Sequence, residues 1–278
     1  MTSGVIAAGA ARLHYVEHGS GSPVLILHGF AGSSAGMTQI IDPLAESHRV
    51  VALDLVGHGE SHLPGSAAEC SMESVVRDVD RLVEGLALAP VHVVGYSMGG
   101  RVALSYAVAQ GGQVASVTAI GASPGIADPG ERADRVAADA TLADQIQRKG
   151  IVWFVDYWST LPILQPGAKA GAAAAESLRR ARLANDPTSL ARVLRGLGAG
   201  SMPPLHDLLT HVELPALLIA GESDPKFRDI AEVLAAAMPR ARAVVVEGAG
   251  HAVHLDNPSG LASVIRSFLA SIDRGSGR

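Results

Sequence analysis

The fold of this chain is decided by residues 91–101, which read VHVVGYSMGGR. An apolar run, 91–94, leads into the pattern Gly95-x-Ser97-x-Gly99, and a helix-like stretch follows from 100 to 110. This order predicts a strand, a tight turn and a helix, with Ser97 exposed on the turn as in a nucleophile elbow. Glycine two residues before and after the serine lets strand and helix approach each other without a side-chain clash.

Apolar runs alternate with helical patterns on both sides of this stretch. The near-continuously apolar runs are typical of parallel strands buried on both faces, whereas 13–17 alternates like an edge strand. Strands are expected at 13–17, 24–27, 50–53, 91–95, 114–120, 216–220 and 243–246. Helices are expected at 72–86, 101–109, 229–238 and 258–272. The pattern predicts an α/β protein with a doubly wound, mostly parallel sheet.

Residues 123–205 interrupt the alternation, because they are rich in alanine and arginine and contain no convincing strand. Helical pieces are expected at 131–149, 152–159, 173–184 and 189–197. We interpret 123–205 as a helical lid inserted into a core made of residues 1–122 and 206–278. Ligands of such sheets bind at the carboxyl ends of the strands, where this lid would lie.

Composition excludes several classes of protein. The 278 residues carry a formal net charge of −5 and no block of lysine or arginine, so nucleic acid is not an expected partner. No secretory signal and no apolar stretch of about 20 residues is present, so no membrane span is expected. Cys70 is the single cysteine and forms no internal disulfide, which favours the cytoplasm. His58 and His62 lie in a glycine-rich loop without a zinc-protease glutamate, so neither a metal nor a cofactor is expected.

Three residues at the ends of predicted strands complete a catalytic pattern. Ser97 is followed in sequence by Asp224, after the strand at 216–220, and by His251, after the strand at 243–246. This is the chain order of a Ser–Asp–His triad on an α/β scaffold. A serine hydroxyl needs an imidazole to take its proton, and a carboxylate to orient that imidazole. Asp54 also ends a strand, and we interpret it as shaping a turn rather than as the triad acid.

An oxyanion site requires two backbone amides near the serine. Met98, directly after the nucleophile, supplies one, and Phe30, in the loop after the strand at 24–27, supplies the other. The side chain of His28 is interpreted as bracing that loop, and His254 as a surface or packing residue.

Arg101 lies one helical turn after Ser97, so both side chains can face one cavity. Burying an unpaired guanidinium is costly, and we interpret Arg101 as a contact for an anionic ligand; an internal salt bridge is the alternative. The inserted segment contains further arginines and a cluster of aromatic residues that either pin the lid to the core or roof a pocket. These residues are Arg132, Arg135, Arg179, Arg180, Arg182, Trp153, Phe154, Tyr157 and Trp158.

Several motifs together resemble the 2-succinyl-6-hydroxy-2,4-cyclohexadiene-1-carboxylate synthase family of the α/β-hydrolase superfamily. They are the elbow at 95–101, Ser123-Pro124-Gly125, and the runs 132–135 (RADR), 154–158 (FVDYW), 221–228 (GESDPKFR) and 249–251 (AGH). The likeness extends over almost the whole chain, and it implies the α/β-hydrolase fold with an inserted helical lid.

The resemblance also implies a reaction. The family eliminates pyruvate from a succinylated cyclohexene dicarboxylate in menaquinone biosynthesis, with the triad serine as general base and the oxyanion site holding an enolate. Carboxylate contacts then fall to Arg101, Arg135 and Arg182, Tyr96 of the elbow joins the substrate contacts, and either Tyr157 or Trp158 is the lid aromatic. The implied ligand is a small polycarboxylate.

Two other functions remain open on the residues alone. The same triad fits a serine hydrolase acting on carboxylic esters or on carbon–carbon bonds of diketone acids. A non-catalytic receptor on the same scaffold is the third reading, since one fold hosts unrelated functions. The sequence does not indicate an oligomeric state.

Overall fold

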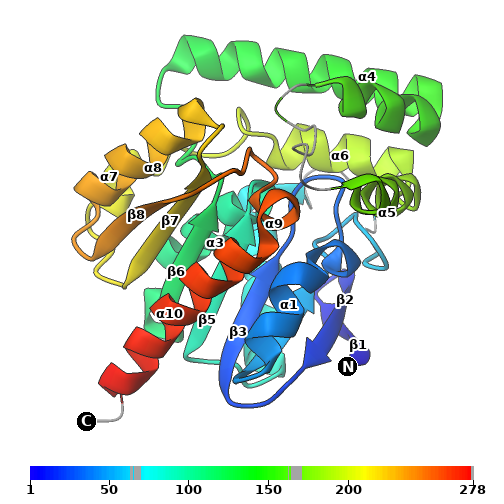
Figure 1. Ribbon diagram of the computed structural model, residues 1–278. Helices are drawn as coiled ribbons and strands as arrows, with labels where there is room; N and C mark the ends of the chain where they lie inside the picture. Colours follow the sequence, from blue (N-terminus) through cyan, green and yellow to red (C-terminus); the bar gives the residue numbers. More distant parts are fainter. Residues whose placement is uncertain (63–64, 66–69, 162, 164–170, 277–278) are drawn as a thin grey trace.

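The computed structural model describes residues 1–62, 65, 70–161, 163 and 171–276. Its centre is an eight-stranded sheet in the order β1-β2-β4-β3-β5-β6-β7-β8 (Figure 1). β1, β2 and β4 pair antiparallel, and every later pairing, from β3–β4 to β7–β8, is parallel. The strands are Thr2–Ala8, Ala11–His18, Ser22–Leu27, His48–Leu53, Val91–Tyr96, Val114–Ile120, Ala216–Gly221 and Ala241–Val246. The predicted mostly parallel α/β sheet is therefore confirmed.

The first strand was not predicted from the sequence. β1 (Thr2–Ala8) reads TSGVIAA, and its small residues and glycine give it little of the β-branched or aromatic character that marks a strand. It forms because its whole length pairs with β2, from Thr2 opposite Glu17 to Ala8 opposite Ala11. The partner strand, and not the propensity of this segment, decides its conformation.

Helices cover both faces of the sheet, and alternate residues of one strand reach both layers. In β3, Val24 and Ile26 pack in a cluster with residues of α1 and α10, whereas Leu25 and Leu27 pack with α2, α3 and α8. Figure 1 shows α1 and α10 together on the near face. The bounds are α1 Thr38–Ala45, α2 Met72–Gly85, α3 Met98–Ala109, α8 Pro225–Ala237 and α10 Pro258–Ser276, with the short α7 His206–Leu209 and α9 Val253–Asp256.

Of the helices between β6 and β7, three belong to the segment 123–205: α4 (Pro129–Thr160), α5 (Gly171–Leu183) and α6 (Pro187–Leu197). Figure 1 shows them above the end of the sheet at which β5 runs into α3. Gly150 has a φ of 80° and interrupts α4, at the break expected between residues 149 and 152. Asp128 and Asp186 cap α4 and α6 by accepting from backbone amides three residues on. Residues 162 and 164–170 of the expected lid lie outside the described residues.

The turn between β5 and α3 has the strained geometry that its sequence requires. Ser97 has φ 51° and ψ −108°, a backbone conformation that residues other than glycine rarely adopt. A Cβ on Gly95 would collide with the carbonyl oxygen of Gly99, and one on Gly99 with that of Leu27. The Ser97 amide donates to the Ile120 carbonyl of β6 at 2.8 Å, which anchors the turn on the neighbouring strand.

None of the helices in the described part of the chain combines the length and apolar character that crossing a bilayer requires.

Substituting Gly95→Ala should lower the free energy of unfolding by about 2–3 kcal/mol, because the added methyl group forces the elbow apart in a closely packed region. Urea unfolding followed by circular dichroism measures this loss. Gly112→Ala is the matched control, since a Cβ there meets no atom within 4 Å. Equal stability of the two variants would contradict the close approach at the elbow.

Candidate active site

The predicted triad residues come together at the ends of three strands. Ser97 follows β5, Asp224 follows β7 and caps α8, and His251 follows β8. The Nδ1 atom of His251 lies 2.7 Å from Oδ2 of Asp224, and its Nε2 atom lies 3.2 Å from Oγ of Ser97. Asp224 and His251 are almost fully buried, with 5% and 6% of their surface exposed. The carboxylate thus holds the imidazole in the tautomer whose Nε2 can take the serine proton.

The loops that carry the acid and the histidine are bonded to each other. The Ser223 amide donates to the Ala249 carbonyl at 2.9 Å, and the Glu222 carboxylate accepts from the Gly248 amide at 2.8 Å. The ring of Phe227 packs on His251 at a centroid distance of 4.6 Å. These contacts fix the imidazole relative to the serine before any ligand is bound.

The loop after β3 carries the expected oxyanion amide of Phe30. The Gly29 carbonyl, which belongs to the same peptide unit as the Phe30 amide, accepts from Gly32 N at 2.9 Å and from His28 Nδ1 at 2.8 Å. His28 Nε2 accepts from the Leu55 amide at 3.0 Å, so the ring is neutral with its proton on Nδ1. Burial lowers the pKa of His28, which keeps this arrangement at neutral pH.

Because a peptide unit is planar, fixing the Gly29 carbonyl also fixes the direction of the Phe30 N–H. The second expected donor, Met98, is the first residue of α3, where backbone amides have no intrahelical acceptor. The Phe30 amide donates no hydrogen bond to any of the described residues. A backbone amide without an acceptor inside the protein is what an oxyanion donor requires.

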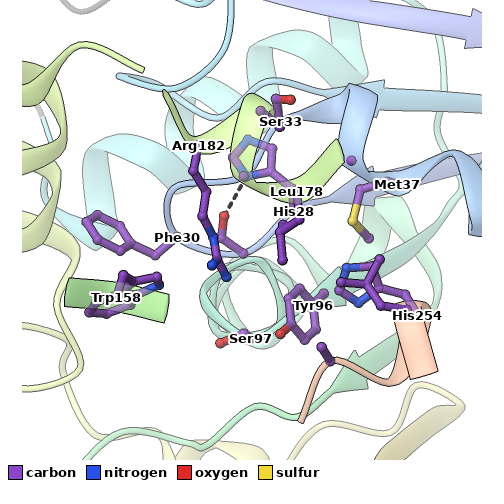
Figure 2. A pocket seen from close by; sticks show the side chains of 16 residues that line it. His28, Phe30, Ser33, Met37, Tyr96, Ser97, Trp158, Leu178, Arg182 and His254 are labelled. Carbon is purple, nitrogen blue, oxygen red and sulfur yellow. Dashed lines mark hydrogen bonds between the residues drawn. The ribbon is translucent and has the colours of Figure 1, made fainter. Parts of the chain in front are cut away.

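Two hollows meet at Ser97, and the first is lined in part by α5. Figure 2 shows Arg182 reaching from α5 toward Ser97 and Tyr96, with Trp158 and Phe30 on one side. Arg182 is 8% exposed, and burial lowers its pKa. No carboxylate forms an ion pair with Arg182 among the residues that the structure describes. The described residues therefore present an unpaired cation to this hollow.

The second hollow also borders Ser97 and contains Arg101, Arg135 and Lys226. Arg101 Nη1 donates to the Leu197 carbonyl at 2.8 Å, and no ion pair of Arg101 is found in the described part of the chain. Burial, with a smaller effect of Arg135, lowers the pKa of Arg101 to about 10, so the guanidinium is charged at neutral pH. The predicted alternative, an internal salt bridge of Arg101, is not what the structure shows.

Arg135 is held by a buried acid on its own helix. Its Nε atom donates to Oδ1 of Asp139 at 2.9 Å, and Asp139 is only 5% exposed. Burial raises the pKa of Asp139, opposed by the two arginines. Asp128 and Glu131 also line this hollow, so its lining carries charges of both signs.

The structure distinguishes the two candidate lid aromatics. Trp158 lines the first hollow, and its ring contacts Phe30 at 5.6 Å. The Tyr157 ring stacks on Trp153 at 5.3 Å and is 38% exposed, so Tyr157 lies away from both hollows. Helical spacing alone placed both residues in one cluster and did not indicate which one faces the serine.

Two other residues have the structural roles expected of them, and His254 in addition lines a hollow next to Ser97. His254, interpreted as a surface or packing histidine, is 5% exposed and lines the first hollow with its ring 4.4 Å from Tyr96. Asp54 accepts from the amides of Ser34 and Glu60, at 2.6 and 2.9 Å, as a turn-shaping residue does. Lys226, which lines the second hollow, stands out in the sequence only as part of the GESDPKFR motif, and no local pattern indicates a role for Asn185.

His58 packs against the loop of residues 28–32, which we call the oxyanion loop after its expected role. Its ring centroid lies 5.0 Å from that of His28 and 5.6 Å from that of Phe30. Its Nδ1 atom donates to the Val56 carbonyl. Among the described residues, no group of three or more potential ligands is placed to hold a metal ion.

Comparison with known proteins agrees with this geometry. A family model described as alpha/beta hydrolase fold matches residues 22–258. The sheet, the elbow and the Ser–His–Asp arrangement define the class as an α/β-hydrolase-fold enzyme.

Individual relatives narrow the class. The chain is 35% identical to a Bacillus subtilis (strain 168) protein named as a 2-succinyl-6-hydroxy-2,4-cyclohexadiene-1-carboxylate synthase, over 90% of each chain. It is 30% identical to the Klebsiella pneumoniae synthase of that name, over 92% of this chain and 98% of the relative. The structure of MenH from S. aureus superimposes with a TM-score of 0.88 at 28% identity, covering 94% of this chain and 98% of that one.

The chain belongs to the 2-succinyl-6-hydroxy-2,4-cyclohexadiene-1-carboxylate synthase family. It is thereby an enzyme of the carbon–oxygen lyase type within the α/β-hydrolase superfamily, and this membership supports a role in menaquinone biosynthesis.

The buried histidines around the site should make the protein less stable in acid. Burial lowers the pKa of His58 and of His254 to about 3, whereas the unfolded chain titrates near 6.5. Stability is therefore complete above pH 6.5 and falls as the pH drops toward 3, by about 1.4 kcal/mol per pH unit for each such histidine. Urea unfolding at pH 7, 6 and 5 measures the slope.

A variant shows how much of that pH dependence comes from His58. His58→Asn keeps a donor near the Val56 carbonyl and should reduce the pH dependence by about one proton. The control is His211→Asn, at an exposed position, which should leave the slope unchanged. Parallel pH profiles for wild type and His58→Asn would contradict the low pKa of His58.

Proposed function

We propose that this enzyme eliminates pyruvate from a succinylated cyclohexene dicarboxylate intermediate of menaquinone biosynthesis. One observation carries the proposal: a serine with its base and acid in place lies where two hollows meet, each containing buried or half-buried arginine. The family membership supports the reaction, and the positions of the cations support a substrate with carboxylates at separate ends.

The proposed first step is removal of a ring proton next to the succinyl ketone. Ser97 Oγ takes the proton as its own proton passes to His251 Nε2, and Asp224 stabilises the resulting imidazolium. The electron pair of the broken C–H bond moves onto the ketone oxygen, which becomes an enolate oxygen bound by the Phe30 and Met98 amides.

In the second step the enolate electrons return into the ring, and the carbon–oxygen bond to the pyruvate-derived group breaks. Pyruvate leaves as its enolate and receives the proton held on His251 Nε2, so that Ser97 and His251 both return to their neutral starting forms. No water is consumed and no acyl-enzyme forms. The protein thus contributes a base, two amide donors and the binding of carboxylates.

The arginines and the lid give this reaction its substrate class. In the proposal Arg101 and Arg135 bind carboxylate on one side of the serine and Arg182 binds carboxylate on the other, because a planar guanidinium matches a carboxylate with two parallel hydrogen bonds. Tyr96 and Trp158 supply the walls around the ring. Residues 123–205 act as the lid, and exclusion of water by the lid favours elimination over hydrolysis.

A serine hydrolase is the second candidate. The 3.2 Å contact between His251 Nε2 and Ser97 Oγ is the arrangement that activates serine as a nucleophile toward esters.

We also propose that the enzyme is located in the cytoplasm, on the basis of its single, buried cysteine.

Replacing Arg101 tests the binding of the anionic substrate. Arg101→Ala should lower kcat/KM for pyruvate release by about 10- to 100-fold, because a charge-assisted contact contributes roughly 1.5–3 kcal/mol. Pyruvate is measured by coupling to lactate dehydrogenase and following NADH. Arg195→Ala is the control, since Arg195 pairs with Asp144 within the lid and lines neither hollow. An unchanged kcat/KM in Arg101→Ala would refute the role of this arginine.

Ester turnover separates the two candidate functions. The wild-type enzyme should release pyruvate at least about 100-fold faster than it turns over p-nitrophenyl acetate, and Ser97→Ala should lower pyruvate release by about 1000-fold or more. Stopped-flow absorbance follows p-nitrophenolate, and the NADH assay follows pyruvate. Fast, repeated ester turnover without pyruvate release would support the hydrolase instead.

A further inference from the structure

Asn185 joins the end of the lid helix α5 to the loop that carries the oxyanion amide. It follows α5 by two residues and is 5% exposed. Its Nδ2 atom donates to the Ala31 carbonyl at 3.1 Å, across 154 residues of sequence. The same atom lies 3.2 Å from the carbonyls of Ala181 and Arg182, within the lid. On its other side, Oδ1 accepts from the Gly59 amide at 3.2 Å.

The partners fix the orientation of this side-chain amide. Three carbonyl oxygens surround one end of it, and carbonyls only accept hydrogen bonds, so that end must be the NH2 group. The other end faces a backbone N–H and must be the oxygen. Every polar atom of the side chain therefore has a partner in one orientation, and reversing the amide would set oxygen against oxygen at Ala31.

The residue that Asn185 holds is in a strained conformation. Ala31 has a φ of 59°, a left-handed geometry that residues with a Cβ avoid. Such a conformation persists only where its surroundings impose it. Ala31 is fully buried in a cluster with lid residues, including Phe154 and Leu190, and its carbonyl is held by Asn185.

Strain at Ala31 bears directly on the oxyanion amide. Phe30 is the preceding residue, and the turn is closed by the bond from Gly32 N to Gly29 O. If Ala31 relaxed to an ordinary φ, Gly32 would rotate away and that bond would be lost. The Gly29–Phe30 peptide unit, which bears the expected oxyanion N–H, would then keep only the contact with His28.

We propose that Asn185 is a positioning residue that couples the Arg182 end of the lid to the oxyanion loop. Arg182 lies three residues before Asn185, and its own carbonyl accepts from the Asn185 side chain. An anion bound by Arg182 thus orders the segment that holds Ala31 in place. This inference rests on the proposed role of the Phe30 amide, and it assigns the alignment of that amide to the lid.

The test measures phosphorylation of Ser97 by diethyl p-nitrophenyl phosphate, a neutral reagent whose developing oxyanion needs the amide donors. Each reacted serine releases one p-nitrophenolate, so the burst gives both the number of competent sites and their rate constant. Asn185→Asp removes the donor to Ala31, and Asn185→Ala removes all hydrogen bonds of the side chain without adding charge. Both variants should keep a burst of about one per chain while the rate constant falls about 10-fold or more.

The chain contains one other asparagine, and it provides the matched control. Asn257 caps α10, donates to the Glu247 carbonyl at 2.9 Å and lines neither hollow. Asn257→Asp makes the same chemical change and should leave the rate constant within about twofold. A smaller burst with an unchanged rate constant in the Asn185 variants would show a purely structural role and overturn the proposal.

The remaining outcomes are also decisive. Unchanged burst and rate in both Asn185 variants, or no burst from the wild-type protein, would overturn the positioning role. In the pyruvate assay the variants should lower kcat more than they raise KM, because the alignment acts on the enolate rather than on substrate binding. If the wild-type protein releases no pyruvate but the burst depends on Asn185 as expected, the lyase proposal fails and the coupling stands.

Discussion

The close approach of two backbone segments at the elbow is the constraint on which the rest of the site depends. Ser97 can hold its left-handed conformation because neither Gly95 nor Gly99 has a side chain to separate β5, α3 and β3. This turn sets the serine above the sheet, starts α3 at the Met98 amide and puts Arg101 one turn further along the same helix. Base, acid and cations are all arranged around a point that the elbow fixes.

The arginines near Ser97 keep their positive charge although they are partly or fully shielded from water. Arg101 donates a hydrogen bond to the Leu197 carbonyl rather than to a carboxylate. The nearby carboxylate of Asp139 accepts from Arg135 instead. A carbonyl satisfies a donor without cancelling its charge, so the guanidinium stays available to an anion. In the first hollow, Arg182 is buried near Tyr96. A ligand with carboxylates at two ends matches this division better than a neutral ester does.

The helices between β6 and β7 contribute side chains to the interior of the site. Trp158 and Phe154 pack against Phe30, so the residue that bears the expected oxyanion amide has its side chain among lid residues. Asn185 adds a polar link between the same two parts of the chain. Because apolar contacts fix distance and hydrogen bonds fix direction, the two together define both the position and the orientation of that loop.

The sequence by itself determined where most strands fall along the chain, the elbow, and the placement of Ser97, Asp224 and His251 after their strands, because each follows from a local pattern. It missed β1, whose composition is not that of a strand, and it left Tyr157 and Trp158 undistinguished. Only the tertiary structure decided that Trp158 faces the serine, that the cations divide between two hollows, and that Asn185 meets Ala31. Those facts depend on which side chains of distant segments pack together, and no local pattern of residues specifies that.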